Sequence, residues 1–310
     1  MELQPTYGYF EAIGIVTGLS STKSVTEGEK EDCQWKRLQF GIKVSHNAFV
    51  YVELMGMKTS RVKVYEAYGN REDNKYIMVD WNELNKFITK KYKIPNMIKI
   101  NINDEPSDLV QMSYDAITYL NSNLNDGDTI LIRGTTKIED YNGEIQEKFT
   151  IKSIYSYDPI NFDDKKYFIS AYFSQEVIFV GFEQIDKNKY SLFGKIVIKE
   201  SSGFRAIPYN FIVYKSGDNT ELIDYLSNKI HFGSLIKVYG NIRHYVPITT
   251  NDEGQRVVVG TSIKELVVTG GSVLESEKYS KEDLEPRTIT GSPFEEDNEV
   301  IKEGFNKFGF

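Results

Sequence analysis

The chain lacks most of the features that mark secreted, membrane-spanning and metal-binding proteins. It has one cysteine in 310 residues, Cys33, which excludes an internal disulfide framework and is typical of a reducing compartment. Its three histidines show no zinc-ligand spacing with that cysteine. No run of about 18 apolar residues predicts a transmembrane helix, and the first residues, MELQPTYGYFEAIG, do not read as a secretory signal. We therefore expect a cytoplasmic protein with no membrane association, no metal and no other cofactor.

Common catalytic motifs are also missing. Gly194-Lys195 lacks both the upstream Gly and the following Ser/Thr of a phosphate-binding loop. Neither G-x-S-x-G nor H-E-x-x-H occurs. The acid pair Asp126/Asp128 lies on a turn, where a solvated turn is the simpler explanation. We expect a protein that is not an enzyme, although a nuclease site assembled from distant carboxylates stays open as an alternative.

The acidic charge is concentrated at one end of the chain. The net charge is −8. Residues 272–310 hold ten acidic and five basic residues, so residues 1–271 carry a net charge of only −3. A basic groove on this nearly balanced body is therefore compatible with the overall acidity.

One segment occurs twice. Residues 120–138 read LNSNLNDGDTILIRGTTKI and residues 226–244 read LSNKIHFGSLIKVYGNIRH. Each passes from the end of a helix through a Gly turn into a short alternating strand, and meets a second Gly seven residues later. This recurrence indicates two copies of one small β-rich unit.

The order of the predicted elements is that of an OB-fold, a five-stranded Greek-key barrel with a helix before its last two strands. We predict a mainly β protein with minor α content, built from two such barrels. Residues 1–157 form the first, with a helical insertion at about 69–107, and residues 158–175 form a linker. Residues 176–270 form the second barrel, and residues 271–310 an acidic tail that is expected to be disordered.

Aromatic and basic residues interleave on the strands that commonly bind ligands in OB barrels. Stacked aromatics and phosphate-tracking cations are the usual means of binding single-stranded nucleic acid. The candidate binding residues of the first unit are Trp35, Lys36, Arg37, Phe40, Lys43, Tyr51, Lys58, Arg61, Lys63, Tyr65, Lys137 and Tyr141. Those of the second unit are Lys195, Lys199, Phe204, Arg205, Tyr209, Tyr214, Lys215, Arg243 and Tyr245.

Two OB-like units followed by an acidic tail that ends in aromatics resemble the plan of a phage-type single-stranded DNA-binding protein. The plan is similar to that of bacterial single-stranded DNA-binding proteins, whose acidic tail ends in an apolar tip that recruits replication partners, and to the tandem barrels of replication protein A. The resemblance covers about residues 5–270 plus the tail and is one of architecture. The chain departs from the bacterial pattern at its end, GFNKFGF, which holds Lys307 and no Asp run before the final Phe.

The resemblance implies sequence-independent binding of single-stranded DNA in viral or phage replication, recombination or repair, in the host cytoplasm. It implies that Phe294, Phe305, Phe308 and Phe310 of the tail contact replication or recombination proteins. Two alternatives remain: a virion or baseplate module that contacts other proteins, and an RNA- or tRNA-binding accessory protein.

Overall fold

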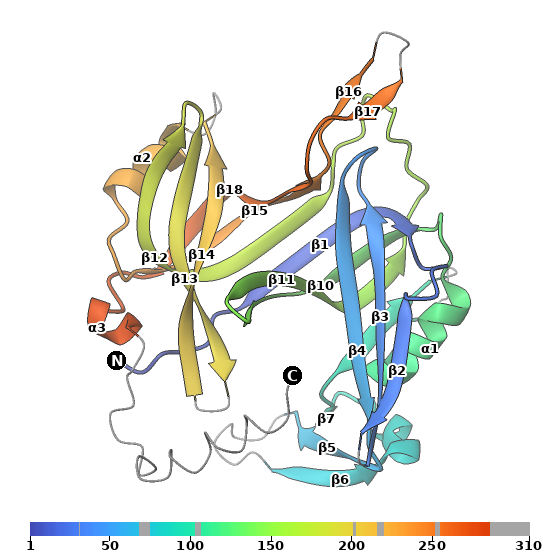
Figure 1. Cartoon of the computed structure of the whole chain (residues 1–310). Coiled ribbons are helices and arrows are strands. Elements are labelled where there is room, and N and C mark those ends of the chain that lie inside the picture. The colour runs from blue at the N-terminus through green and yellow to red at the C-terminus, as the bar shows by residue number, and fades with distance from the viewer. Residues whose placement is uncertain are drawn as a thin grey trace, which may run out of the picture.

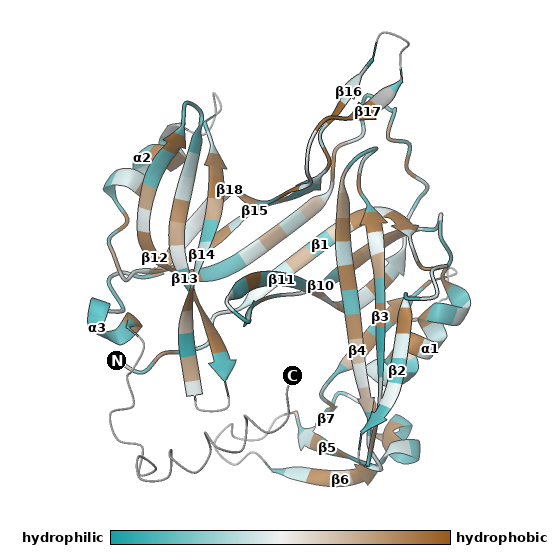
Figure 2. Ribbon diagram, viewed as in Figure 1, coloured by the Kyte–Doolittle hydropathy of each residue, from teal (hydrophilic) through white to brown (hydrophobic). Residues whose placement is uncertain are grey.

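The computed structural model describes residues 1–30, 32–67, 75–102, 107–200, 203–215, 220–251 and 255–285, and these are mainly β (Figure 1). Apolar and polar residues alternate along the strands, so that each strand turns one face to the core (Figure 2). The predicted fold class is confirmed. The chain builds two five-stranded barrels with few helices in the described ranges.

The first barrel closes in the strand order of an OB-fold. Its strands are β1 (Gly8–Thr17), β3 (Cys33–Lys43), β4 (Phe49–Lys58), β10 (Thr129–Tyr141) and β11 (Glu144–Ser156). β1 pairs with β3, β3 with β4, β4 in parallel with β11, β11 with β10, and β10 again with β1. Helix α1 (Ser113–Asn123) precedes β10 and buries Ala116, Ile117 and Leu120. β2 (Val25–Lys30) pairs with the first half of β3, from Cys33 to Leu38.

The chain between β4 and α1 forms additional structure outside the barrel. β5 (Arg61–Glu66) pairs with β6 (Tyr76–Asp80) and β7 (Tyr92–Lys93) in a separate three-stranded sheet. η1 (Trp81–Phe87) is a 3₁₀ helix within the segment predicted as a helical insertion. β8 (Met97–Asn101) pairs with β11 and with β9 (Leu109–Met112). The structure outside the barrel therefore starts before residue 69, because β4 already occupies the third barrel position beside β11.

The second barrel repeats the same strand order. Its elements are β12 (Ala171–Asp186), β13 (Lys189–Glu200), β14 (Gly203–Tyr214), α2 (Thr220–Asn228), β15 (Leu235–Tyr245) and β18 (Ile263–Glu275). β12, β13, β14, β18 and β15 pair in a closed ring, with β14 and β18 parallel. β16 (Ile248–Thr250) and β17 (Arg256–Val258) form a projecting two-stranded ribbon. β12 begins inside the segment predicted as a linker.

The two barrels share one sheet and one core. β1 pairs antiparallel with β12, and Phe10 lies opposite Phe173. Both phenylalanines are buried in a single apolar cluster that extends from the first barrel into the second. Since Phe173 belongs to β12, the linker ends before the strand that joins the barrels.

Two glycines take equivalent places in the two barrels. Gly134 lies opposite Phe10 and Gly240 opposite Phe173, and the strand ladder shifts register at each of them. A Cβ on Gly134 would lie 2.0 Å from the Thr150 carbonyl oxygen, and one on Gly240 would meet the Val267 carbonyl oxygen at 1.9 Å. These close backbone approaches explain why the second Gly recurs in both segments.

The C-terminal end of the described chain departs from the predicted tail. Residues 271–275 complete β18, and a short helix, α3 (Lys281–Leu284), follows. Tyr279 and Leu284 are buried against the second barrel. Lys195 Nζ donates a hydrogen bond of 2.7 Å to the Leu284 carbonyl oxygen. Single anchor residues give no periodic signal, which is why the sequence alone predicts a tail from residue 271. Phe294, Phe305, Phe308 and Phe310 lie outside the described residues.

Replacing Gly134 with alanine should destabilise the fold. The new Cβ would overlap a backbone oxygen that cannot rotate away, and we expect the free energy of unfolding to fall by about 2 kcal/mol. Gly181→Ala is the matched control, because a Cβ there meets nothing within 4 Å. Urea denaturation measures both variants, and equal effects of the two would contradict the close approach.

Candidate nucleic-acid interface

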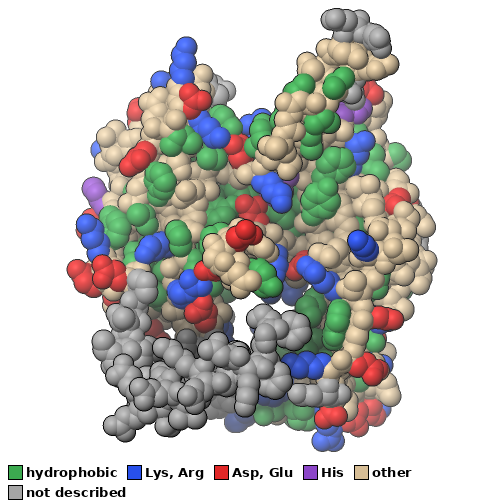
Figure 3. All heavy atoms as spheres, in the orientation of Figure 1, with side chains coloured by type: hydrophobic (Ala, Val, Ile, Leu, Met, Phe, Trp, Pro, Cys, Tyr) green, Lys and Arg blue, Asp and Glu red, His purple; other side chains and the backbone are tan. Residues whose placement is uncertain are grey.

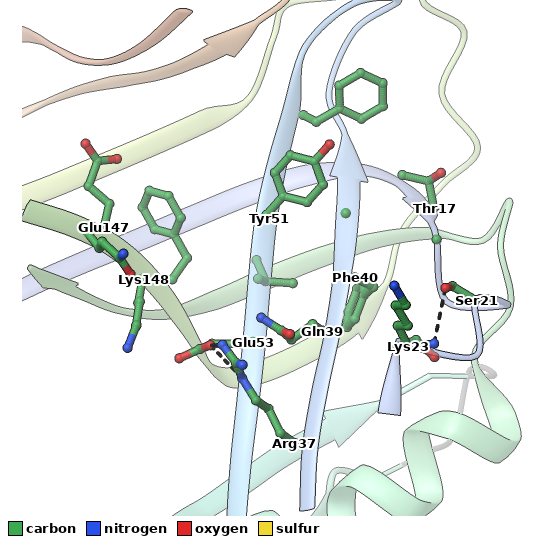
Figure 4. Close-up of a pocket in the computed structure, with 17 residues that line it drawn as sticks. Thr17, Ser21, Lys23, Arg37, Gln39, Phe40, Tyr51, Glu53, Glu147 and Lys148 are labelled. Atoms are coloured by element: carbon green, nitrogen blue, oxygen red, sulfur yellow. Dashed lines mark hydrogen bonds and ion pairs between the residues drawn. The ribbon is translucent and has the colours of Figure 1, made fainter. Parts of the chain in front are cut away.

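A groove of about 630 Å³ lies on the outside of the first barrel (Figure 4). Its walls are the loop after β1, the outward faces of β3 and β4, and the start of β11. Successive residues of a strand point to opposite faces, so Arg37 and Gln39 of β3 reach the groove together with Tyr51 and Glu53 of β4. These are the strands and loops that bind ligands in OB barrels.

Tyr51 is the most exposed aromatic residue of the groove. Its side chain is 63% exposed, and it lies cross-strand from Gly41. A Cβ on Gly41 would come within 3.4 Å of the Tyr51 ring, so the glycine leaves room for the ring beside β3. Phe49 stacks next to Tyr51 with ring centroids 6.4 Å apart. The two rings offer a surface on which bases can stack.

The same face continues along the ladder beyond the groove. Met55 and Met57 are 53% and 58% exposed and lie opposite Arg37 and Trp35. The Trp35 ring rests against Gly28 of β2, where a Cβ would lie 2.9 Å from it. Phe49, Met55 and Met57 are not among the predicted binding residues, although they alternate with buried residues in the same strand as Tyr51. Exposed methionines provide an adaptable apolar surface.

The groove holds charges of both signs. Arg37 forms an ion pair of 2.5 Å with Glu53, and Lys148 of β11 pairs with Glu139 at 2.5 Å. Lys23 lies at the rim. On β10 and β11, partial burial lowers the pKa of Lys152 and the nearby charge of Lys137 adds to this, which indicates that these two lysines lie close together. Neither of them lines the groove.

Three predicted residues of β3 and β4 do not lie on this face. Phe40 is 4% exposed and belongs to the core, where it forms part of the groove floor. Lys36 donates to the Thr118 hydroxyl and lies over the Tyr114 ring of α1 at 4.9 Å. Lys58 lies over the same ring at 5.7 Å. Helix α1 covers the opposite face of the ladder, so these lysines are held away from the groove.

The other predicted residues of the first unit are dispersed. Lys43 lies over the Phe162 ring at 5.7 Å. Arg61, Lys63 and Tyr65 belong to β5, outside the barrel, where Arg61 pairs with Asp80. Tyr141 is 64% exposed at the tip of the β10–β11 hairpin. Near its tip that hairpin packs on the second barrel, through Asp140 and Arg205, while the start of its β11 strand lines the groove.

In the second barrel, three predicted residues make structural contacts. Lys195 binds the carbonyl of Leu284, Arg205 pairs with Glu200 and Asp140, and the Tyr209 hydroxyl donates to Glu147. Lys199, Phe204 and Lys215 lie exposed near strand ends. These six residues therefore do not gather in one groove.

A second cluster of charged and aromatic side chains lies in the second barrel, where Lys189 and Tyr214 pair across β13 and β14 as Arg37 and Met55 pair across β3 and β4. Arg243 lies over the rings of Tyr214 and Tyr245 at 5.2 and 5.7 Å. The Tyr214 hydroxyl donates to Glu265, which also pairs with Lys189 at 2.7 Å. The Glu265 side chain is only 9% exposed, so this cluster is held together mainly by its own contacts.

Glu147 links the groove to the second barrel. It lines the groove, and its carboxylate accepts hydrogen bonds from the Tyr209 hydroxyl and, at 3.1 Å, from His244 Nε2. Burial alone would raise the pKa of Glu147, but the His244 and Tyr209 contacts outweigh it and the pKa lies below its ordinary value. Burial and the Glu147 charge raise the pKa of Tyr209 well above its ordinary value. The ionised carboxylate therefore holds the barrels together.

No group of three or more His, Cys, Asp or Glu side chains is placed to hold a metal ion within the described ranges. Nor does any helix in the described part of the chain have the length and apolarity to cross a membrane.

Fold and groove together define a mainly β protein with two OB-type barrels and one open strand face. A family model named YorF matches residues 58–299, so the chain belongs to the YorF family. No curated protein matches the chain.

Among solved structures, the chain is similar to the single-stranded DNA-binding protein of Thermus aquaticus. The identity is 10% and the TM-score 0.39, over 87% of this chain and 94% of that one. It is also similar to mitochondrial Rim1 of S. cerevisiae, at 20% identity and a TM-score of 0.22, over 34% and 95% of the two chains. A replication protein A heterotrimer bound to single-stranded DNA gives 8% identity and a TM-score of 0.22, over 88% and 94%. Since all three TM-scores are below 0.5, the function has to be argued from the groove.

Acid should weaken the fold through Glu147. Because the pKa of Glu147 is lowered in the folded state, its stabilisation is complete above the ordinary value of about 4.3 and is lost as the pH falls through the folded pKa. At neutral pH, Glu147→Gln should lower the free energy of unfolding by roughly 1–3 kcal/mol. The variant should also lose part of the pH dependence below about pH 4.3.

Urea denaturation at neutral and acidic pH measures both effects. Glu144→Gln, at an exposed position of the same strand, is the control. A variant at Glu147 that is as stable as this control at neutral pH would refute the role of the carboxylate.

Proposed function

We propose that the protein binds single-stranded DNA, without sequence preference and without catalysis, along the outward face of β3 and β4. The observation that carries this proposal is the open row of Tyr51, Phe49, Met55 and Met57 with Arg37 and Lys148 beside it. Bases would stack on the rings and methionines, and the cations would track the phosphates. The first barrel supplies this site.

The biological role that fits such an activity is the coating of exposed strands in phage or viral replication, recombination or repair. Residues 286–310, with their four phenylalanines, would recruit replication or recombination proteins. Strong salt dependence of binding would follow from the phosphate contacts.

Binding is tested by fluorescence anisotropy of a labelled oligo-dT of about 30 nucleotides, which spans two barrels at roughly 4–16 nucleotides per OB-fold. The full chain and a variant truncated after Glu285 are titrated at low and moderate salt. Salt-sensitive binding by both would support the proposal. Preference for an RNA oligomer of equal sequence would favour an RNA-binding accessory protein, and no binding at low salt would favour a virion or protein-interaction module.

Removing the Tyr51 ring should weaken binding more than removing another exposed tyrosine. Loss of one stacked base costs about 1–3 kcal/mol, so Tyr51→Ala should raise the Kd by roughly 5- to 150-fold. Tyr225→Ala on α2 is the matched control, since Tyr225 is 46% exposed and lies outside the groove. The same anisotropy titration measures both, and equal Kd values would refute the assignment of the groove.

Removing the Glu53 carboxylate should strengthen binding. Glu53 neutralises Arg37 and would repel phosphates, so Glu53→Gln frees a cation and removes a negative charge from the groove. We expect a gain of about 0.5–1 kcal/mol, or roughly two- to five-fold in Kd at low salt. Glu183→Gln, at an exposed position of β12, should leave the Kd unchanged. Weaker binding by the Glu53 variant would show that the ion pair itself shapes the site.

A further inference from the structure

The three-stranded sheet outside the first barrel, β5–β7, has two unlike faces. Residues that lie directly opposite each other on antiparallel strands share a face. Val62 of β5 and Val79 of β6 are such a pair, and their face packs with Leu84 of η1 in a small apolar core of its own. The other face of the sheet is turned away from that core and is open to solvent.

Tyrosines, a methionine and lysines make up most of this solvent face. Tyr65 of β5 lies between Tyr76 of β6 and Lys93 of β7, and the two tyrosine ring centroids are 5.9 Å apart. Lys63 of β5 lies over the Tyr76 ring at 4.4 Å and opposite Met78 of β6. Tyr76 and Met78 are 48% and 44% exposed. The face thus repeats the combination of rings, methionine and cations that lies along β4.

The cations of this face are less neutralised than those of the groove. Within the described residues, Lys63 and Lys93 form no ion pair with a carboxylate. Arg61 pairs with Asp80 at 2.9 Å, but the two side chains are 59% and 60% exposed, so that water screens the pair. In the groove, by contrast, the arginine of β3 and the lysine of β11 each have a carboxylate partner. A cation without such a partner gains more from a phosphate, which makes the two lysines the stronger phosphate contacts.

The sheet begins where the row of exposed residues on β4 ends. Only three residues separate Met57 of β4 from Arg61 of β5, so their Cα atoms are at most about 14 Å apart. The bend between the strands is fixed, because the Trp81 N–H donates to the Ser60 carbonyl oxygen at 3.0 Å. Figure 1 shows β5, β6 and β7 at the lower end of β4, and Figure 3 shows basic side chains close to hydrophobic ones at that end. A nucleic-acid strand that lies along β4 can therefore run on to this sheet.

We propose that the solvent face of the β5–β7 sheet is a second contact site for single-stranded DNA, used by the same strand that occupies the groove. Bases would stack on Tyr65 and Tyr76. A base on Tyr76 would displace the Lys63 ammonium from the ring, and the flexible lysine stem would carry it to an adjacent phosphate. Lys93 would bind a further phosphate. This inference rests on the proposed function, because it extends the path of the same strand.

The salt dependence of binding tests the two lysines. Each phosphate contact with a single strand contributes about 0.7 to the slope of log Kd against log salt concentration. The double variant Lys63→Gln/Lys93→Gln should therefore lower this slope by about 1.4 in the oligo-dT titration. The matched control is Lys187→Gln/Lys229→Gln, which removes two exposed cations of the second barrel and should leave the slope unchanged. Equal slopes for the two double variants would overturn the proposal.

The Tyr76 ring provides an independent test. Tyr76→Ala should raise the Kd roughly five-fold or more, whereas Tyr225→Ala, which removes a ring of similar exposure on α2, should not change it. Because both rings would contact one strand at separate places, the effects of Tyr76→Ala and Tyr51→Ala should multiply in a double variant. A Tyr76 variant that binds as tightly as the Tyr225 variant, or a double variant no weaker than Tyr51→Ala alone, would overturn the second contact.

The same titrations separate this inference from the proposed function. Binding that responds to Tyr51→Ala but not to the variants of the small sheet would overturn the second site and leave the groove. Binding that responds to the variants of the small sheet alone would overturn the groove and leave the sheet as the contact. A wild type that binds no oligo-dT at low salt would overturn both.

Discussion

The antiparallel pairing of β1 with β12 is the contact on which the rest of the architecture depends. β1 closes the first barrel through β3 and β10 and at the same time joins the first strand of the second barrel. Its inward side chains, Phe10 among them, complete a core that both barrels share. The start of β11 consequently reaches the second barrel, and Glu147 belongs both to the groove wall and to the contact with Tyr209 and His244.

The two barrels have the same strand order but different side chains at equivalent surface positions. Lys43 and Lys195 hold equivalent places, opposite Ile15 and Ile178, and their partners on the next strand are Phe49 and Pro208. Two residues further along, Tyr51 in the first barrel corresponds to Asn210 in the second. The first barrel thus has Phe49 and Tyr51 where the second has Pro208 and Asn210. Next to these positions in the second barrel, Glu265 contacts Lys189 and Tyr214.

The strands and the fold class could be predicted from the alternating pattern and the recurring glycines, because both follow from local backbone geometry. The position of Arg37 and Tyr51 on one face followed from the same alternation. The same alternation puts Lys36 and Lys58 on the opposite face. Their contacts with α1 could not be predicted, because that helix is far along the chain. The burial of Tyr279 and Leu284 could not be predicted from the sequence either, because contacts of two single residues with distant strands leave no periodic pattern.

The central claim is that single-stranded DNA lies along the outward face of β3 and β4 in the first barrel. Photo-crosslinking of a bromodeoxyuridine-substituted oligo-dT to the full chain, followed by mass spectrometry of the peptides, tests it most directly. We predict adducts on the β3 and β4 peptides, at Trp35, Phe49 or Tyr51, that disappear at high salt. Adducts confined to the second barrel, or none where the oligomer is shown to bind, would contradict it.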